Sequence, residues 1–360
     1  MSTLQDPKLP TLELALSDQA MQSKLYQALN PQNGLGSFSA IRHRVLKHKA
    51  GKHCVIEYLP EMNGQAAIPP RVIGKLYRDQ RGEKMFENLQ NLWAAADQAG
   101  KTFGMPRLLA YLPELGMVIQ EAVPGWPMNS LLNNKNLSSA VRVTARNLAA
   151  LHRLNVPSLE KRSMADHLKK YCRPGPEVLM ETFSEITPLL KKIVNQLLDE
   201  ERLEPIPVAT VHGDLGLEQI FIYEDQAFFI DFDGMCRSHA ALDVGNFLVA
   251  LRVYLGDESQ QLSQLFLSTY LEELGAEQVE GLNIYCAFAY LRRAMICFRK
   301  SISSLDGVYP ERSRRTQDEE KPLHGERSRI MNKKSGDFSS GKFEQMRYLL
   351  ETSYDYVTKA

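Results

Sequence analysis

Two short motifs just past the middle of the chain decide the fold. The first reads Val211-His212-Gly213-Asp214-Leu215, and the second reads Phe229-Ile230-Asp231-Phe232-Asp233. Between them, two runs of aromatic and β-branched residues flank a turn at 224–226, which predicts two short strands joined tightly. Asp214 follows a strand and precedes a loop, a position where a carboxylate can face a cleft instead of the core.

A second polar residue, Gln219, begins the first of these two strands. Because a tight turn brings the outer ends of the strands side by side, Gln219 and Asp231 can share one ion. Amide and carboxylate oxygens suit a hard cation such as Mg²⁺. Asp233 lies two residues on and hence on the same strand face, so it is an alternative or second ligand. A carboxylate for an acceptor hydroxyl and oxygen ligands for magnesium are among the groups that phosphoryl transfer requires.

The first third of the chain has mainly strand patterns. Residues 1–33 predict a helical lead-in, and alternating residues at 38–59 around a turn at 49–52 predict a hairpin. A third strand is predicted at 71–77, a helix at 83–99, and two further strands at 108–111 and 117–120. Proline and glycine at 121–127 interrupt regular structure. We therefore expect a nucleotide-binding N-terminal lobe at 34–122 and a C-terminal lobe at 123–360.

The C-terminal part is mostly helical in pattern. Apolar residues keep helical spacing around 141–152 and at 177–200, 259–274 and 282–300. The segment 310–342 is rich in charges of both signs, serine and glycine, and we expect a solvated, flexible loop there. A closing helix is predicted at 343–357.

The two motifs, in this order and spacing, resemble those of the aminoglycoside phosphotransferase and choline kinase superfamily. Lys75 in the third predicted strand and Leu242-Asp243 add support, and the resemblance spans roughly residues 34–300. It implies an α+β, protein-kinase-like, two-lobed fold, with a small antiparallel sheet and a helix in the N-lobe and a mostly helical C-lobe. It also implies ATP-dependent transfer of the γ-phosphate to a hydroxyl of a small metabolite, such as a sugar, an amino alcohol or an aminoglycoside-like compound.

The resemblance also implies roles for single residues. Asp214 would be the catalytic carboxylate, and Asp231 the principal Mg²⁺ ligand, with Gln219 beside it. Lys75 would contact the α and β phosphates of ATP, held by Glu87 or, as the second choice, Glu83. The backbone near Glu121 to Val123 would receive the adenine, and the loop at 34–39, with Ser37, would cover the phosphates. His212 and Asp243 would support the catalytic loop.

The sequence departs from the family pattern inside the first motif. The usual pattern reads His-Gly-Asp-Leu-His-Pro-Gly-Asn, whereas Gly216 and Gln219 stand here for the second histidine and the asparagine. Glutamine keeps the amide oxygen, and Leu217-Glu218-Gln219 is similar to the maltose kinase branch. The departure motivates an alternative, a kinase-like nucleotide-binding module with weak or no turnover. Protein kinase activity is disfavoured, because the Asp-Phe-Gly and Ala-Pro-Glu motifs and the arginine of the catalytic loop are missing.

Composition excludes few functions. Lysine plus arginine and aspartate plus glutamate both total 43, so no net charge favours a nucleic acid or an anionic membrane. The five cysteines have no metal-like spacing and are expected to be reduced core thiols. The N-terminus does not resemble a secretory signal and the apolar runs are short, so we expect a cytoplasmic protein without membrane spans. The pattern says nothing about oligomeric state.

The acceptor is left open by the sequence. Acidic residues between 257 and 280 would suit a cationic acceptor, whereas Arg292, Arg293, Arg299 and Lys300 would suit an anionic one. His152 lies on the apolar face of its helix and is expected to be a hydrogen-bonded core histidine.

Overall fold

A computed structural model describes residues 4–33, 38–62, 71–100, 103–199, 207–305 and 340–358 of the chain. These residues form two compact units. The first unit comprises Met1–Leu159, Gly216–Met235 and Leu265–Glu273, and the second comprises Glu160–Leu215, Cys236–Gln264 and Leu274–Ala360. The first unit includes residues 123–159 and 216–235, which lie beyond the lobe boundary expected after residue 122.

A five-stranded antiparallel sheet lies at the centre of the N-terminal part of the first unit, as the sequence predicts. The hairpin partners pair around the expected turn, with Lys49 opposite His53. The strand order is β1-β2-β3-β5-β4. The strands are β1 (Phe38–Lys49), β2 (His53–Met62), β3 (Val72–Tyr77), β4 (Leu108–Leu112) and β5 (Met117–Glu121).

One face of this sheet packs on the helical lead-in, α1 (Leu12–Ala15) and α2 (Asp18–Asn33). Val72 and Leu76 belong to that core, and a Cβ added at Gly74 between them would lie 2.7 Å from the Tyr58 ring. Alternate residues of a strand point to opposite faces. Lys75 and Tyr77 therefore project from the other face of β3.

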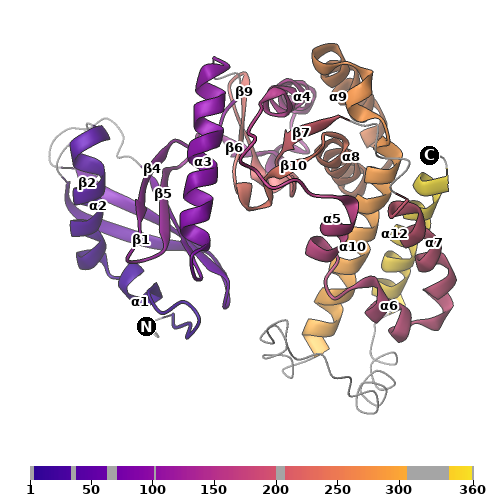
Figure 1. The fold of residues 1–360 in the computed structure, drawn as a ribbon, viewed down its shortest axis with the longest axis horizontal. Helices are drawn as coiled ribbons and strands as arrows, with labels where there is room; N and C mark the ends of the chain where they lie inside the picture. Colours follow the sequence, from indigo (N-terminus) through magenta and orange to yellow (C-terminus); the bar gives the residue numbers. More distant parts are fainter. Residues whose placement is uncertain are drawn as a thin grey trace. The chain divides into compact units, whose positions relative to one another are not determined.

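The remainder of the first unit surrounds a three-stranded sheet, β6-β8-β9. The segment after α3 joins it to the N-terminal part, because Gly104 exchanges backbone hydrogen bonds with Ala227 and Phe229. Helix α4 contacts β9. The elements are α3 (Arg81–Gln98), β6 (Trp126–Pro127), α4 (Leu137–Arg153), η4 (Leu217–Gln219), β8 (Ile220–Tyr223), β9 (Gln226–Phe229) and η5 (Phe232–Gly234) (Figure 1).

The second unit is mostly helical and packs around α10. Two strands, β7 and β10, pair antiparallel within it, with Val211 opposite Cys236. Helix α9 contains residues of both units. The elements are α5 (Met164–Tyr171), α6 (Pro176–Thr182), α7 (Thr187–Leu197), β7 (Val208–Val211), β10 (Cys236–His239), α8 (Ala241–Leu255), α9 (Ser259–Leu274), α10 (Leu282–Leu305) and α12 (Ser340–Thr358).

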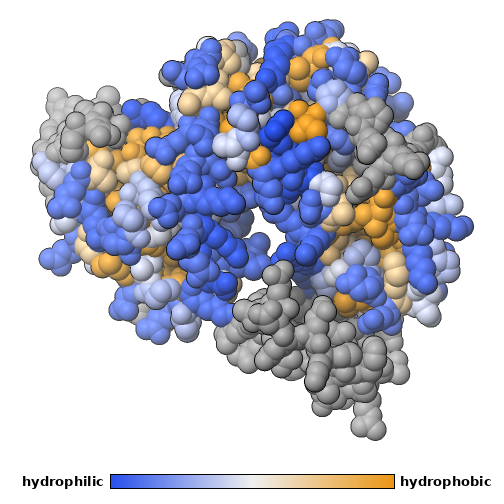
Figure 2. Space-filling view, viewed as in Figure 1, coloured by the Kyte–Doolittle hydropathy of each residue, from blue (hydrophilic) through white to orange (hydrophobic). Residues whose placement is uncertain are grey.

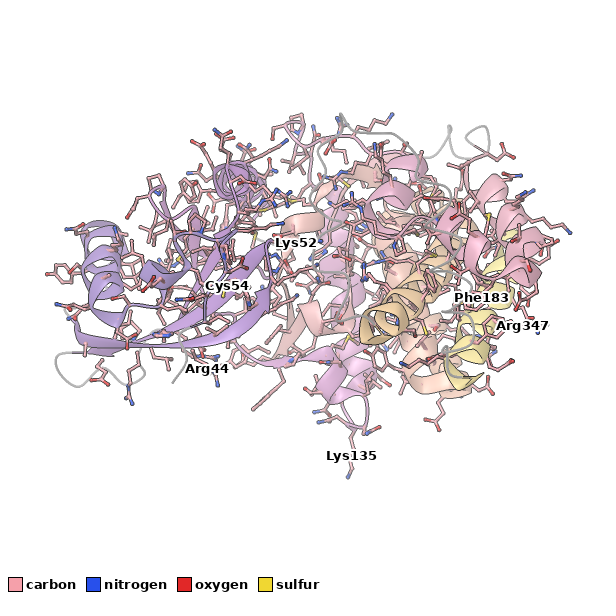
Figure 3. All side chains as sticks on the ribbon, turned by 90° about the horizontal axis from the view of Figure 1, so that it is seen from below. Arg44, Lys52, Cys54, Lys135, Phe183 and Arg347 are labelled. Carbon is pink, nitrogen blue, oxygen red and sulfur yellow. The ribbon has the colours of Figure 1, made fainter. Side chains whose placement is uncertain are left out.

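The single helical stretch predicted at 177–200 is wrong in one respect, because it forms two helices. Phe183 takes an extended conformation that ends α6, and Pro188 stands at the start of α7. The Phe183 ring packs against Phe343 of α12, with ring centroids 5.0 Å apart (Figure 3). Helices α5 and α8 were not expected. Helix α8 is buried over most of its surface and so lacks the amphipathic period that reveals a helix.

All five cysteines are free, and four of them are buried, Cys54 among them (Figure 3). Within the described ranges, no helix is long and apolar enough to cross a membrane. The expected loop at 310–342 lies mostly outside the described residues, and the closing helix appears as α12.

We predict that His167 makes the stability of the protein depend on pH. Its ring is fully buried, Nε2 lies 2.9 Å from Ser238 Oγ, and burial lowers its pKa to about 4, helped by Arg162 and Lys170. The unfolded chain therefore binds more protons between pH 6.5 and 4, so stability falls as the pH falls through this range. The loss at pH 5 is about 2 kcal/mol.

Urea unfolding of the wild type and of His167→Gln at pH 7 and pH 5 measures this contribution. The variant should lose about 2 kcal/mol less than the wild type between the two pH values. An equal loss in both proteins would contradict the assignment.

Candidate functional site

Lys75 and two carboxylates form a compact ion cluster in the first unit. The Nζ atom of Lys75 lies 2.5 Å from Asp231 Oδ1 and 2.6 Å from Asp233 Oδ1, although 156 residues separate Lys75 from Asp231. The hydroxyl of Tyr77 donates to the same oxygen of Asp233 at 2.8 Å. Lys75 and Tyr77, on one face of β3, thus contact the aspartates of the second motif.

The backbone holds the two carboxylates beside Lys75. Asp231 follows β9 and has φ of +66°, a left-handed conformation that is uncommon outside glycine. This sharp turn starts η5. The expectation that Asp231 and Asp233 lie on the same face of one strand is therefore wrong. Both nevertheless reach Lys75. Such strain in a residue other than glycine is frequent at functional sites.

The charges in the cluster stabilise one another. Lys75 is buried, which by itself would lower its pKa, but the carboxylates of Asp233 and Asp231 outweigh burial and raise it. Burial and Asp233 raise the pKa of Tyr77 well above its usual value. Lys75 is therefore a fixed cation and Tyr77 a neutral hydrogen-bond donor at neutral pH.

Two further basic residues adjoin the cluster from the β1–β2 hairpin. Lys47 Nζ lies 3.8 Å from Asp231 Oδ2. His53 pairs with Tyr77 across the strands, and burial together with Lys75 lowers its pKa to about 4, so its ring is neutral. The cluster therefore combines two lysines with two carboxylates, a set of groups that can bind phosphates and a hard cation together.

The donor set fits Mg²⁺ through Asp231 and Asp233. Magnesium in phosphoryl-transfer enzymes uses one or two protein carboxylates and completes its shell with substrate phosphates and water. The side chains of Asp231 and Asp233 are 26% and 34% exposed, so both oxygens are accessible. A group of three or more histidine, cysteine or acidic side chains that could hold a metal ion is absent from the described residues.

Gln219 does not join this cluster. Its Oε1 accepts a hydrogen bond from the Gly216 amide at 2.7 Å, and its carbonyl accepts one from Ile230. The glutamine side chain thus closes its own loop, whereas Asp233, the alternative or second ligand expected from the sequence, lies with Asp231 beside Lys75.

Glu87 and Glu83 are likewise not the partners of Lys75. Both are exposed on α3 and line a surface pocket of about 540 Å³ with Asp79, Lys84 and Ser158. The opposite face of α3, with Leu89, Leu92 and Ala96, is buried. The surface over α3 is accordingly hydrophilic in the space-filling view (Figure 2). Among the described residues, the ion pairs of Lys75 are with Asp231 and Asp233.

The segment expected to receive adenine ends strand β5. The amides of Glu121 and Ala122 donate to the carbonyls of Arg107 and Arg71, at 2.9 and 3.0 Å. Within the part of the chain that the structure describes, the Val123 amide makes no such bond. The loop with Ser37, which was expected to cover the phosphates, lies outside the described residues apart from Phe38 and Ser39, which belong to β1.

Asp214 lies in the second unit, on a loop that the backbone and Asp243 hold. Gly213 has φ of +78°, a conformation that glycine adopts without strain. The carboxylate of Asp243, fully buried in the first turn of α8, accepts hydrogen bonds from the amides of His212 and Gly213, at 2.6 and 2.9 Å. His212 is also fully buried. The Asp214 side chain remains one-third exposed.

Arg292 of α10 contacts Asp214 directly. Its Nη2 donates to Asp214 Oδ1, and its guanidinium stacks on the ring of Tyr171, 4.7 Å from the centroid. The sequence showed Arg292 only as one of several basic residues in a helix. The contact joins α10 to the loop after β7, which lies 78 positions earlier in the chain, so no local signal indicated it.

Tyr77 is another residue that the sequence analysis missed, and here a signal existed. It lies two positions after Lys75, on the same face of the strand, as the alternation of β3 requires. His152, by contrast, lies in the core as expected, with Nδ1 2.7 Å from the Tyr270 hydroxyl.

Comparison with protein families gives one match over most of the chain. The model of the phosphotransferase enzyme family matches residues 65–281, which include both aspartate motifs. No curated protein sequence matches the chain significantly.

Several solved structures share the fold at low sequence identity. Choline kinase from Cryptosporidium parvum Iowa II has a TM-score of 0.58 and 13% identity, with 95% of this chain and 96% of that chain covered. A choline/ethanolamine kinase family protein from Mesorhizobium loti has a TM-score of 0.54 and 12% identity, with coverage of 94% and 100%. A spectinomycin phosphotransferase in complex with ADP and spectinomycin has a TM-score of 0.56 and 11% identity, with coverage of 94% and 98%.

These structures show the predicted α+β, kinase-like fold, and the family match covers more than half of the chain. The chain belongs to the phosphotransferase enzyme family.

Proposed function

We propose that this phosphotransferase transfers the γ-phosphate of ATP to a hydroxyl of a small metabolite, a sugar, an amino alcohol or an aminoglycoside-like compound. The observation that carries the proposal is the convergence of Lys75 on Asp231 and Asp233. The spectinomycin phosphotransferase with the same fold binds ADP, which supports an adenine nucleotide here. The free cysteines agree with a reducing, cytoplasmic location.

Lys75 binds the α and β phosphates in this proposal. A buried lysine needs a compensating carboxylate in each state of the protein. With Asp231 on a metal ion, Asp233 would remain the partner of Lys75, held in place by the hydrogen bond from the Tyr77 hydroxyl, and would do the work that the resemblance assigned to Glu87. Val123 and the backbone around Glu121 receive the adenine.

Asp231, with Asp233 beside it, would hold Mg²⁺, which neutralises charge on the phosphates when bound. Asp214 orients the acceptor hydroxyl and accepts its proton as the oxygen bonds to the γ-phosphorus and the bond from that phosphorus to the leaving ADP breaks. The hydrogen bonds from the His212 and Gly213 amides to Asp243 keep the loop in one conformation, so the carboxylate needs little reorganisation. His212 and Asp243 are thus positioning residues.

A second candidate is a nucleotide-binding module without transfer. Two observations favour it: the amide oxygen of Gln219 is engaged by Gly216, and Arg292 occupies an oxygen of Asp214. The two candidates agree on ATP binding and differ in whether a phosphorylated acceptor forms.

We predict that Asp214→Asn lowers acceptor-dependent turnover about 10²- to 10⁴-fold, the usual range for loss of a general base. MgATP binding, followed by thermal shift, should remain because Asp214 makes no contact with the nucleotide in the proposed mechanism. Glu218→Gln, which removes an exposed carboxylate from the same loop, is the matched control and should keep full turnover. Wild-type binding of MgATP without any phosphorylated acceptor would favour the second candidate.

We predict different defects for the two carboxylates that contact Lys75. Asp231→Asn should raise the Mg²⁺ concentration for half-maximal turnover about 10- to 100-fold, as expected for loss of one charged contact. Asp233→Asn should mainly raise KM for ATP, because Lys75 loses its holding partner. The control is Asp225→Asn, in the exposed turn between β8 and β9. If Asp231→Asn left the magnesium dependence unchanged, its assignment as principal ligand would be wrong.

A further inference from the structure

We propose that the acceptor carries a negative charge, a carboxylate or phosphate group close to the hydroxyl that is phosphorylated, and that Arg292 binds this group. The inference rests on the proposed function, because it takes Asp214 as the residue that orients the hydroxyl. It narrows the acceptor to one chemical class, oxyanion-bearing alcohols.

The guanidinium of Arg292 has further hydrogen-bond donors beside Asp214, where the acceptor binds in the proposed function. In the described part of the chain, its hydrogen bond goes to Asp214 Oδ1 and its flat face stacks on Tyr171. A guanidinium has five donors in a planar fork, so one contact with a carboxylate leaves several for a second anion. The side chains of Arg292 and Asp214 are 19% and 33% exposed, so a solute can reach both. An anion bound to Arg292 would place its neighbouring hydroxyl beside Asp214.

Tyr171 holds the guanidinium and adds a donor. Its ring, at the end of α5, contacts Arg292 on one side and has the Lys170 ammonium 5.2 Å from its centroid. Its hydroxyl is buried with no hydrogen-bond partner among the described residues. Unpaired buried hydroxyls are rare in folded proteins, and one beside Arg292 favours an oxygen-bearing ligand. Burial and then Asp214 raise the pKa of Tyr171 well above its usual value, so the hydroxyl keeps its proton.

The charges around Tyr171 are mainly positive. Arg162, with a side chain only 16% exposed, joins Arg292 and Lys170, and it also acts electrostatically on the Tyr171 hydroxyl. Its ion-pair partner Glu160 is 61% exposed, so solvent screens that carboxylate. Two cations, Arg292 and Arg162, and one carboxylate, Asp214, act on this hydroxyl. This field repels an ammonium group and attracts an oxyanion.

The other acidic residue of α5 does not change this balance. Asp166 lies in the first turn, where its carboxylate accepts hydrogen bonds from the amide and hydroxyl of Ser163. Tyr171 is at the opposite end of the helix. Asp166 therefore caps α5 and leaves the cations near Asp214 in excess.

The test uses the full chain, MgATP and four acceptor pools. These contain hydroxy acids and sugar acids, sugar phosphates, amino alcohols with aminoglycosides, and neutral sugars. A phosphorylated product from the first or second pool supports the inference and distinguishes a carboxylate from a phosphate. With that acceptor, Arg292→Gln should raise KM for the acceptor about 10- to 100-fold and leave KM for ATP unchanged.

Three further variants separate recognition from folding. Arg292→Lys, which keeps the charge, should recover part of the affinity. Lys170→Gln should raise the acceptor KM less than Arg292→Gln, because it changes the field without removing the direct contact. Lys300→Gln removes an exposed charge from the same helix α10 and should leave both KM values unchanged.

Either of two outcomes would overturn the inference. Turnover restricted to amine-bearing or neutral acceptors would exclude an anionic acceptor while leaving the phosphotransferase function intact. Failure of all four pools would also overturn it, and MgATP binding measured on the same sample would then show whether the proposed function fails as well.

Discussion

A buried lysine that must be neutralised dominates the architecture of the first unit. Lys75 is 8% exposed, and an ammonium group in such surroundings is costly unless carboxylates lie within hydrogen-bond distance. The carboxylates come from a segment more than 150 residues away, so the hairpin β8–β9 and the turn at Asp231 must be held against β3. Within the same unit, the exchange of backbone hydrogen bonds between Gly104 and β9 ties this hairpin to the segment after α3. The proposed nucleotide site and the folding of this unit therefore depend on the same contact.

The order of elements in the first unit could be predicted from the sequence, because hydrophobic alternation and turn residues are local signals. The hairpin, the third strand, α3 and the strands β4 and β5 all appear at or near their predicted positions. The partner of Lys75 could not be predicted. The choice between α3 and the second motif depends on which face of β3 packs on α1 and α2, and on the left-handed turn at Asp231. The alternation of hydrophobic and polar residues in the sequence predicts neither the packing nor the turn.

In the second unit, the sequence identified the loop of Asp214 but not its surroundings. The sequence signals are the Gly213-Asp214 pair and Asp243, about thirty residues later. The Asp243 carboxylate does accept hydrogen bonds from the loop amides. Arg292 of α10 contacts Tyr171 at the end of α5 and Asp214 in the loop after β7, three segments that are far apart in the sequence. Residues that distinguish one acceptor from another are brought together by tertiary packing and leave no local sequence signal. A family pattern therefore identifies the reaction more readily than the substrate.

Each unit is built from three separate stretches of the chain. A fragment that ends at Leu159 would contain the whole five-stranded sheet and Lys75, yet it would lack both aspartates and the two strands that pair beside β6. The lysine would then be a buried cation without a counter-charge. The first unit therefore cannot be detached as a continuous fragment: a shortened gene product, a protease-derived piece or a fusion that separates residues 159 and 216 would lose this unit as a whole.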